Sequence, residues 1–302
     1  MPFLFAPKCA KIEVFYVKSG SGAKDMTKKI AFIGTGAMGG AILRAACQGV
    51  NPEQVFLTDW AQEKAEALAR ELGCHAISSN KAAAEAADII FLCVKPQIGA
   101  QVLAEIAPIL LESVKAGKPK VLCSILAGVT IQTMRKIVGE SNYPIIRIMP
   151  NTPALIGKGL LLLSCDDAVS EADKNALSEL VAPCGAAEWM SEKLLDQATA
   201  VSGCSPAFVY MFIEALADGG VSIGVPRAQA IQFAAQAVYG AAAMVMETGE
   251  HPGVLKDMVC SPGGSTIAGV AALEDGGFRR AVIQAVQQSA KRNAELGEIE
   301  TT

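Results

Sequence analysis

Residues 30–39 of the chain, IAFIGTGAMG, decide its fold. The four apolar residues at the start are typical of a strand that is buried on both faces of a parallel sheet. Three glycines with the spacing G-x-G-x-x-G follow, and a helical stretch, 41–48, comes directly after them. In this context Gly34 permits a tight turn, Gly36 lets the backbone approach a pyrophosphate, and Gly39 lets the helix pack closely on the strand. The stretch therefore predicts a dinucleotide site.

Strands and helices alternate after this stretch, which predicts βαβ units around a parallel sheet. The expected strands are 30–33, 55–59, 89–94, 121–125, 145–148, 160–163 and 184–188. The expected helices are 41–48, 62–72, 98–111, a helix capped by Ser170 and Asp173 that ends at Val181, and then 206–221, 226–248 and 278–296. The chain therefore divides into a flexible extension (1–27), a dinucleotide-binding Rossmann domain (28–191) and a helical domain (192–302).

The composition excludes several classes of protein. Of 302 residues, 51 % are hydrophobic and 19 % charged, so disorder is excluded for most of the length. A formal charge of −4 argues against a nucleic-acid partner. Nine cysteines without a C-x-x-C pair, and only two histidines, predict no metal site and reduced thiols in a cytoplasmic protein.

Both apolar segments that resemble targeting or membrane signals have a simpler interpretation. The N-terminal residues lack the pattern of a signal peptide, and Met26 is a plausible start of translation, so we expect the extension to be dispensable. The uncharged stretch 228–246 reaches transmembrane length but carries three glutamines, which are costly in lipid. We therefore expect no membrane partner, and we expect this stretch to be a buried or interface helix.

Asp59 lies at the end of the second expected strand, twenty residues after Gly39. An acid at this place binds the ribose hydroxyls of the adenosine, and its charge disfavours a 2′-phosphate, so it predicts a preference for NADH over NADPH. Lys64, one turn into the next helix, would soften that repulsion. The alternative is that Asp59 turns away and caps the helix that begins near Gln62.

Two further groups of residues have the chemistry of ligand sites. The turns Lys95-Pro96, Ala127-Gly128 and 149–153 follow expected strands, and ligands of parallel sheets bind outside the carboxyl ends of the strands. Residues 260–266, CSPGGST, precede an apolar helical stretch, and such a loop holds a carboxylate with its backbone N–H groups. The alternatives are plain loop punctuation and a flexible inter-helix loop with capping hydroxyls.

From Lys28 to about Leu296 the chain resembles the pyrroline-5-carboxylate reductase family, and only the extension lies outside the resemblance. The motifs that carry it are FIGTGAMG (32–39), VKP (94–96), AGVT (127–130), RIMPNTPA (147–154), GEHPG (249–253) and LKDMVCSPGGSTI (255–267). The last of these is highly specific to the family.

The resemblance implies a fold, a reaction and a set of site residues. It implies a Rossmann-type parallel sheet domain followed by an all-helical dimerisation domain, with interlocked dimers that often assemble into larger rings. It implies hydride transfer from NADH or NADPH to the cyclic imine 1-pyrroline-5-carboxylate, which gives L-proline. The implied cofactor residues are Ile33, Gly34, Thr35, Gly36, Ala37, Met38, Asn80, Cys93, Val94, Lys95, Pro96, Ala127 and Gly128. The sequence pattern discussed above adds Gly39 and Asp59 to this set. The implied substrate residues are Ser261, Gly263, Gly264, Ser265 and Thr266, with Thr266 as the catalytic hydroxyl.

Two other functions stay open at this level. A β-hydroxyacid dehydrogenase shares the plan but places a catalytic lysine on the first long helix of its second domain, and 206–221 contains no lysine. A non-catalytic dinucleotide sensor would keep the glycine motif but would have no use for the loop 261–266. One departure from the family, Cys204 where serine is more common, changes little volume and affects only the detail of that turn.

Overall fold

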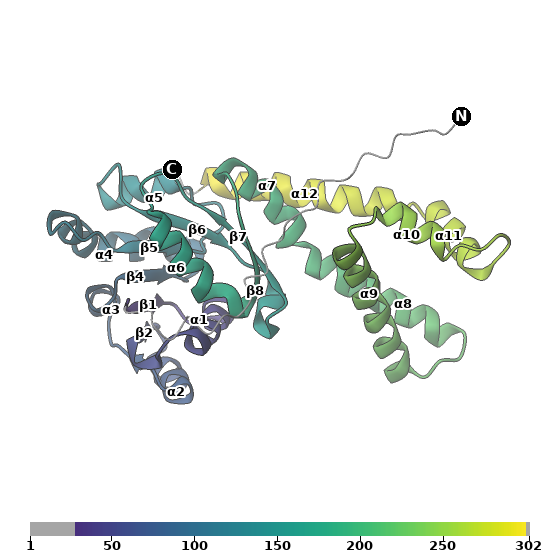
Figure 1. Ribbon diagram of the computed structural model, residues 1–302, viewed down its shortest axis with the longest axis horizontal. Helices are drawn as coiled ribbons and strands as arrows, with labels where there is room; N and C mark the ends of the chain where they lie inside the picture. The colour runs from purple at the N-terminus through teal and green to yellow at the C-terminus, as the bar shows by residue number, and fades with distance from the viewer. Residues whose placement is uncertain (1–27, 300–302) are drawn as a thin grey trace. The chain divides into compact units, whose positions relative to one another are not determined.

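The computed structural model of the protein describes residues 28–299 (Figure 1). The predicted extension, with Met26, and the last three residues of the predicted helical domain lie outside the described residues. The described chain forms two compact units, Ser205–Gln287 and the remainder, 28–204 with 288–299.

The larger unit is built on an eight-stranded sheet in the order β3-β2-β1-β4-β5-β6-β7-β8. The strands are β1 Ile30–Ile33, β2 Val55–Thr58, β3 His75–Ala76, β4 Ile89–Leu92, β5 Val121–Ser124, β6 Ile145–Met149, β7 Gly159–Ser164 and β8 Gly185–Trp189. All neighbouring pairs are parallel except β6 and β7. Residues 150–158 alone connect these two strands, and a parallel crossover needs a longer connection. The sheet is therefore dominated by parallel pairs, with one antiparallel pair that the sequence did not indicate.

Helices cover both faces of this sheet (Figure 1). They are α1 Ala37–Gly49, α2 Gln62–Leu72, α3 Asn80–Ala86, α4 Pro96–Lys115, α5 Ile131–Val138, α6 Glu171–Val181 and α7 Glu192–Ser202, with short 3-10 turns η2 Pro52–Gln54, η3 Thr152–Ile156 and η4 Ala182–Cys184. Alternate strand residues face opposite cores. Ile30 and Phe32 pack in the core that contains α1, α2 and α6, whereas Ala31 and Ile33 pack in the core that contains α3, α4 and α5.

Local signals in the sequence explain where several helices begin and end. The Ser170 hydroxyl accepts a hydrogen bond from the Asp173 backbone N–H at 3.1 Å, as the predicted cap of α6 requires. Gly73 ends α2 in the left-handed conformation, at φ +72°. Helix α1 begins four residues earlier than predicted, at Ala37, because the glycine motif itself enters the first helical turn.

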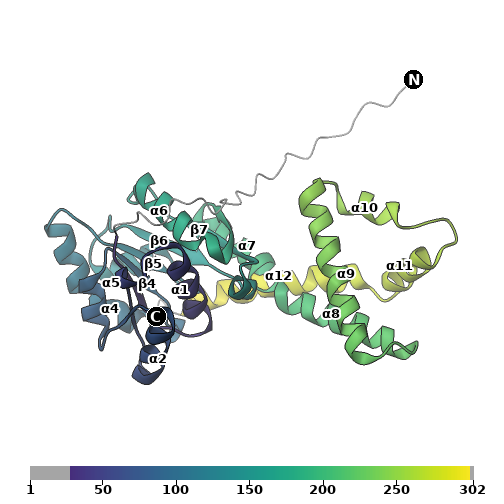
Figure 2. The same ribbon diagram turned by 60° about the horizontal axis from the view of Figure 1, so that its bottom comes forward.

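The smaller unit is helical throughout its regular structure (Figure 2). Its elements are α8 Ser205–Ser222, α9 Arg227–Thr248, α10 Pro252–Met258, α11 Ser265–Asp275 and the first part of α12 Phe278–Ile299, which extends into the other unit. Helices α8 and α9 pack together through a small core of Ala217, Ala230 and Ala234. Large apolar side chains elsewhere in this unit are exposed, among them Tyr210, Met211 and Phe233.

Two helical stretches in the described part of the chain are long and apolar enough to cross a membrane by length and composition. The first is α4, which contributes Leu103, Ile106 and Leu110 to a core of the larger unit. The second, Glu192–Ser222, comprises α7, α8 and the two residues between them. The uncharged sequence 228–246 forms most of α9 and is not among them.

Candidate active site

The glycine motif forms the turn between β1 and α1, and each glycine meets a different constraint. Gly34 has φ +93°, and a Cβ there would lie 2.8 Å from the carbonyl oxygen of Cys93. A Cβ on Gly39 would lie 2.5 Å from the Gly34 carbonyl oxygen and 2.7 Å from the Cys93 Cβ. These two glycines therefore permit the turn and the close packing of α1 against the end of β4.

Gly36 differs from the other two because no atom lies within 4 Å of a Cβ built on it. It is the N-cap of α1, no side chain caps the helix there, and the first turn carries no acidic residue. Uncapped backbone N–H groups and the positive end of the helix dipole favour an anion at this point. The open space at Gly36 fits the role expected for the second glycine of the motif, the approach of a pyrophosphate.

Asp59 is held by three hydrogen bonds at the end of β2. Its Oδ2 accepts from the Thr35 backbone N–H at 2.7 Å and from the Thr35 hydroxyl at 3.0 Å. Its Oδ1 accepts from the backbone N–H of Ala61, the N-cap residue of α2, at 3.1 Å. The carboxylate therefore lies beside the glycine turn and also holds the entry to α2, the contact that the alternative interpretation of Asp59 expected. Its binding to the ribose hydroxyls stays a prediction.

A pocket of about 400 Å³ opens between the glycine turn and the start of α2. Its lining residues are Thr35, Gly36, Ala37, Gly40, Ala41, Arg44, Asp59, Trp60, Ala61, Lys64, Leu68 and Leu155. Arg44 forms an ion pair with Glu71, whereas no ion pair within the described residues involves Lys64. The pocket thus combines one carboxylate with two cations beside the helix N-terminus.

The other predicted cofactor residues lie along the same edge of the sheet. Strands β1, β4 and β5 are adjacent, and Ile33 pairs with Leu92, which pairs with Ser124. The residues that follow these strands, Cys93 to Pro96 and then Ala127-Gly128, therefore lie at the carboxyl ends where Gly34 turns. Cys93 packs in a core of the larger unit, and burial raises the pKa of its thiol.

Asn80 begins α3, directly after the cap residue Ser79. Its side-chain amide donates a hydrogen bond to the Glu105 carboxylate on α4 at 2.8 Å. The Asn80 carbonyl oxygen keeps its capacity to accept. The structure therefore gives Asn80 a structural partner that the sequence did not indicate.

The predicted substrate loop lies in the smaller unit, between α10 and α11. Gly263 has φ +69°, and the Gly264 N–H donates to the Ser261 carbonyl oxygen at 3.0 Å, which closes a tight turn. Gly264 is the N-cap of α11 and has no side-chain cap, and Ser265 and Thr266 follow in the first helical turn. The loop thus presents hydroxyls and backbone N–H groups and contains no charged side chain, which suits a carboxylate ligand.

Sequence reasoning missed a buried ion cluster centred on Arg147, in the middle of β6. The Arg147 side chain is 1 % exposed and donates to Glu192 at 2.9 Å and to Asp196 at 2.7 Å, both on α7. Glu192 also accepts the backbone N–H of Ile131 at the start of α5, at 2.8 Å. Farther along, Asn151 donates to the Ser202 carbonyl oxygen at the end of α7, at 3.0 Å. An arginine within an apolar strand, with two acids one helical turn apart downstream, was the available signal.

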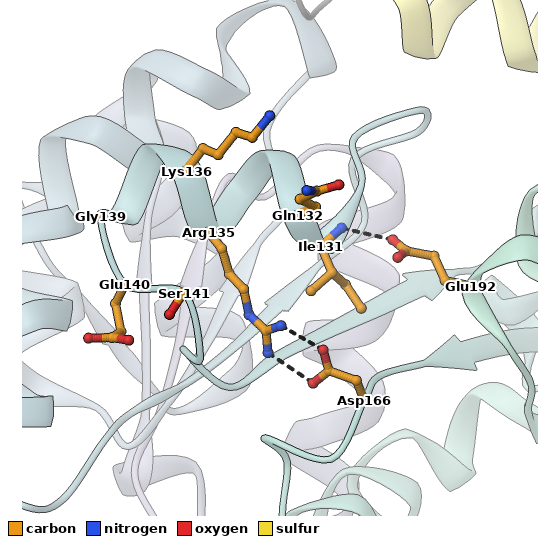
Figure 3. Close-up of a pocket in the computed structure, with 9 residues that line it drawn as sticks. All are labelled: Ile131, Gln132, Arg135, Lys136, Gly139, Glu140, Ser141, Asp166 and Glu192. Atoms are coloured by element: carbon orange, nitrogen blue, oxygen red, sulfur yellow. Dashed lines mark hydrogen bonds and ion pairs between the residues drawn. The ribbon is translucent and has the colours of Figure 1, made fainter.

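A second, larger pocket of about 630 Å³ lies beside α5 and contains none of the predicted site residues. Its lining residues are Ile131, Gln132, Arg135, Lys136, Gly139, Glu140, Ser141, Asp166 and Glu192. Figure 3 shows Arg135 pointing across this pocket to Asp166, with two hydrogen bonds of 2.6 and 2.9 Å. The Arg135 guanidinium holds the pKa of Asp166 below its usual value. These charges satisfy one another, so we assign this pocket no part in the chemistry.

The fold and the glycine cradle define a Rossmann-type dinucleotide-binding protein, and the family match that follows narrows this class to the NAD(P)-dependent oxidoreductases. Residues 29–128 match the profile of the family described as NADP oxidoreductase coenzyme F420-dependent. Residues 192–296 match the profile described as pyrroline-5-carboxylate reductase dimerisation.

Curated relatives place the chain more narrowly. Pyrroline-5-carboxylate reductase of Escherichia coli K12 is 45 % identical over 273 residues, which cover 90 % of this chain and 99 % of that protein. The enzyme of the same name from Pisum sativum is 40 % identical over 268 residues, 88 % of this chain and 95 % of that protein. The chain therefore belongs to the family of pyrroline-5-carboxylate reductases, and the resemblance seen in the sequence is confirmed.

Solved structures agree with this placement. A Plasmodium falciparum pyrroline carboxylate reductase with NADP bound superposes with a TM-score of 0.80 at 33 % identity, over 90 % of this chain and 98 % of that chain. A pyrroline-5-carboxylate reductase from Coxiella burnetii gives 0.81 at 30 % identity, over 89 % and 98 %. The predicted fold class is confirmed, and the match to a dimerisation family supports self-association through the smaller unit.

Proposed function

We propose that the protein reduces the C=N double bond of 1-pyrroline-5-carboxylate and so makes L-proline in the last step of proline biosynthesis. The observation that carries the proposal is the combination, in one chain of this family, of the open cradle at Gly36 with the uncharged hydroxyl loop 261–266. The cradle suits a pyrophosphate, and the loop suits a small carboxylate. Reduction of a cyclic imine that carries one carboxylate, by a dinucleotide cofactor, requires both kinds of site.

The proposed reaction requires little acid–base chemistry from the protein side chains. The reduced nicotinamide supplies the hydride when the cofactor is bound. The protein must orient the imine, hold its carboxylate and place a donor at its nitrogen. We assign the carboxylate to Ser261, Gly263, Gly264 and Ser265, and the nitrogen to the Thr266 hydroxyl.

The cofactor residues are proposed from the fold together with the family resemblance. Residues 33–39 are assigned to the pyrophosphate, Asp59 to the adenosine ribose, and Ala127-Gly128 to the nicotinamide ribose. Asn80 and residues 93–96 are assigned to the remaining wall of the dinucleotide site. The close contacts of Gly34 and Gly39 and the free space at Gly36 support the first of these assignments.

We further propose that NADH is preferred to NADPH. Asp59 lines the pocket, and three hydrogen bonds hold its carboxylate in place. A fixed negative charge in the adenosine end of the site would repel a 2′-phosphate, which supports the proposal. Arg44 and Lys64 line the same pocket, and we expect them to reduce the discrimination without reversing it, because Arg44 is already paired with Glu71. The test is kcat/KM for both cofactors in the wild type and in Asp59→Ser, which we expect to shift toward NADPH. A wild-type preference for NADPH contradicts the proposal.

Assembly beyond the dimer and location in the cell are also proposals. By resemblance to the family we expect dimers to assemble into larger rings. We expect the protein in the cytoplasm, and the eight cysteines that the structure describes are all free thiols.

The deciding experiment is an assay of both directions of the reaction. The purified protein is expected to oxidise NADH or NADPH in the presence of the cyclic imine, and to reduce NAD⁺ or NADP⁺ in the presence of proline. Turnover of a β-hydroxyacid but not of proline would favour a β-hydroxyacid dehydrogenase. Cofactor binding without turnover of either substrate would favour a dinucleotide sensor.

A further inference from the structure

Trp60 presents a large apolar surface that the fold of the larger unit does not use. Its exposed fraction is 93 %, compared with 77 % for Ile156 and 56 % for Leu155 in the same unit. Folded proteins seldom leave an indole almost wholly in water, because burying it contributes substantially to stability or binding.

The exposure of Trp60 does not come from a loose segment. Its preceding residue, Asp59, is held to Thr35 by two hydrogen bonds, and its following residue, Ala61, donates its N–H back to Asp59 at 3.1 Å. The backbone on both sides of Trp60 is therefore fixed, and the indole extends from a short closed turn. The backbone is thus preorganised for a ligand, and only the two side-chain torsions of the indole remain to be ordered on binding.

Trp60 lines the same pocket as Thr35, Gly36 and Lys64. One end of this pocket is the N-terminus of α1, which suits a pyrophosphate. Asp59 is hydrogen-bonded to Thr35 at that end, and Trp60 is the residue that follows Asp59. A group that follows a pyrophosphate and a ribose in a dinucleotide is the purine base. A purine is flat and aromatic, and its face stacks favourably on an indole.

We propose that the indole of Trp60 is the surface on which the adenine of the cofactor stacks. The inference rests on the proposed dinucleotide site but not on the proposed preference for NADH. NADH and NADPH carry the same adenine, so Trp60 contributes equally to both, whereas Asp59 distinguishes them. Trp60 is thus a binding residue for the adenosine end of the cofactor and takes no part in hydride transfer.

A protein partner is the competing explanation for an exposed indole. Trp60 lies outside residues 192–296, which match the dimerisation family, so it is not part of the region assigned to self-association. The indole also adjoins cations and a helix N-terminus, features that suit a nucleotide better than an apolar protein surface.

The chain is well suited to a direct binding test because it has only two tryptophans, Trp60 and Trp189. Trp189 is half-buried and donates to the Ser178 hydroxyl at 3.1 Å. In Trp189→Phe the fluorescence therefore reports Trp60 alone, and in Trp60→Phe it reports Trp189 alone. The probe is ADP-ribose, which contains adenine but no nicotinamide. We expect saturable quenching in Trp189→Phe and no change in Trp60→Phe.

Affinities of the full-length protein complete the test. We expect Trp60→Ala to weaken ADP-ribose binding in calorimetry roughly tenfold to a hundredfold, and Trp60→Phe to weaken it far less. The KM values for NADH and NADPH should rise by the same factor, with kcat nearly unchanged. Reduced nicotinamide mononucleotide, which lacks adenine, should be used equally by wild type and Trp60→Ala. Ile156→Ala, an exposed apolar change outside the pocket, is the matched control.

The outcomes are distinct. An ADP-ribose affinity in Trp60→Ala within twofold of the wild type overturns the proposal. So does an equal loss with reduced nicotinamide mononucleotide, or a change of oligomeric state without a change of affinity. If the protein fails to turn over the imine, the proposed reaction is wrong, yet the ADP-ribose measurements still decide the role of Trp60.

Discussion

The two units of the protein bury their apolar residues in opposite ways. In the larger unit, strands and helices enclose two extensive cores that contain nearly all the large apolar side chains of the sheet. Between residues 205 and 287, only Ala217, Ala230 and Ala234 are buried hydrophobics. Many large apolar side chains of the smaller unit are exposed, among them Tyr210, Met211 and Phe233, and soluble monomers seldom expose large apolar patches. The larger unit thus forms its cores within one chain, whereas the smaller unit leaves apolar side chains available for a partner, in agreement with the match to a dimerisation family.

The largest effect is expected from charges placed on α9. Phe233 and Tyr239 are each 60 % exposed, and glutamates at both positions would be buried without partners in a dimer. We expect Phe233→Glu/Tyr239→Glu to abolish the dimer in light scattering and to lower the melting temperature strongly. The control is Ile156→Glu on η3, 77 % exposed in the larger unit, which should change neither quantity. A double variant that remains dimeric would break the comparison.

The next largest effect is a difference in stability between alanine variants of two glycines in the larger unit, Gly34 and Gly36. Alanine at Gly34 meets both a positive φ of 93° and a backbone oxygen 2.8 Å from its Cβ, so we expect a loss of about 2–4 kcal/mol in unfolding free energy. Alanine at Gly36 meets no atom within 4 Å, and its cost should stay within about 1 kcal/mol. Gly36→Ala should instead weaken cofactor binding, since its methyl group fills the space left for the ligand. Equal stability losses in the two variants would refute this division.

A buried ion cluster gives the third effect. Replacing Arg147 by methionine leaves Glu192 and Asp196 without their partner, although both acids retain some contact with water. We expect a loss of about 2–3 kcal/mol in denaturant unfolding, independent of protein concentration because the cluster lies within one unit. The control, Arg44→Met, removes an exposed pair with Glu71 and should cost less than about 1 kcal/mol. A concentration-dependent loss in Arg147→Met would show that the larger unit also relies on its partner.

The sequence predicted the frame of the larger unit because its strands are continuous apolar runs between glycine and proline signals. It did not predict β3, α3, α5 or α7 as separate elements. The first three are short, with two, seven and eight residues, so tertiary contacts determine them more than local propensity does. Helix α7 has eleven residues, as many as the predicted α2 and α6, so its length does not explain why it was missed. The antiparallel direction of β7 was missed for a different reason. Strand direction follows from the connection, and residues 150–158 are too few for a parallel crossover, a signal that the strand residues themselves do not carry.

The candidate site was predictable to a similar degree. The glycine spacing predicted a cradle, and the contacts of Gly34 and Gly39 agree with it. The partners of Asp59 and of Arg147 come from distant parts of the chain, Thr35 and α7, and no local pattern specifies them. The roles of Thr266 and of the loop before α11 stay predictions that rest on chemistry and family resemblance.

Thr266 lies in the partner-dependent unit, yet we expect its replacement to affect catalysis and not folding. The side chain is exposed in the first turn of α11, so Thr266→Ala should leave the melting temperature and the dimer intact. Loss of one aligned donor should lower kcat/KM for the imine by roughly tenfold to a hundredfold, equivalent to about 1–3 kcal/mol. Cofactor affinity should barely change. Thr248→Ala, which removes another exposed hydroxyl in the same unit, should leave kcat/KM unaltered.

The smallest effect concerns the surface of the larger unit, where charge should matter little. Arg135 lowers the pKa of Asp166 below the ordinary value of 3.8 through a side-chain hydrogen bond. A carboxyl whose pKa is lower in the folded state stabilises the fold above its unfolded pKa, and this contribution is lost as the pH falls through the folded pKa.

Because the Asp166 side chain is 46 % exposed, the pair should contribute less than about 1 kcal/mol near neutral pH. We therefore expect Asp166→Asn to be slightly less stable than wild type at neutral pH, and the difference to shrink as the pH falls below the unfolded pKa and through the lower folded pKa. Denaturant titrations at neutral pH and across this acidic range measure the difference, with Asp167→Asn as the control because no ion pair in the described chain involves Asp167. A difference that persists unchanged at the lower pH would mean that Asp166 acts through its shape and its hydrogen bonds to Arg135, and that its charge contributes nothing.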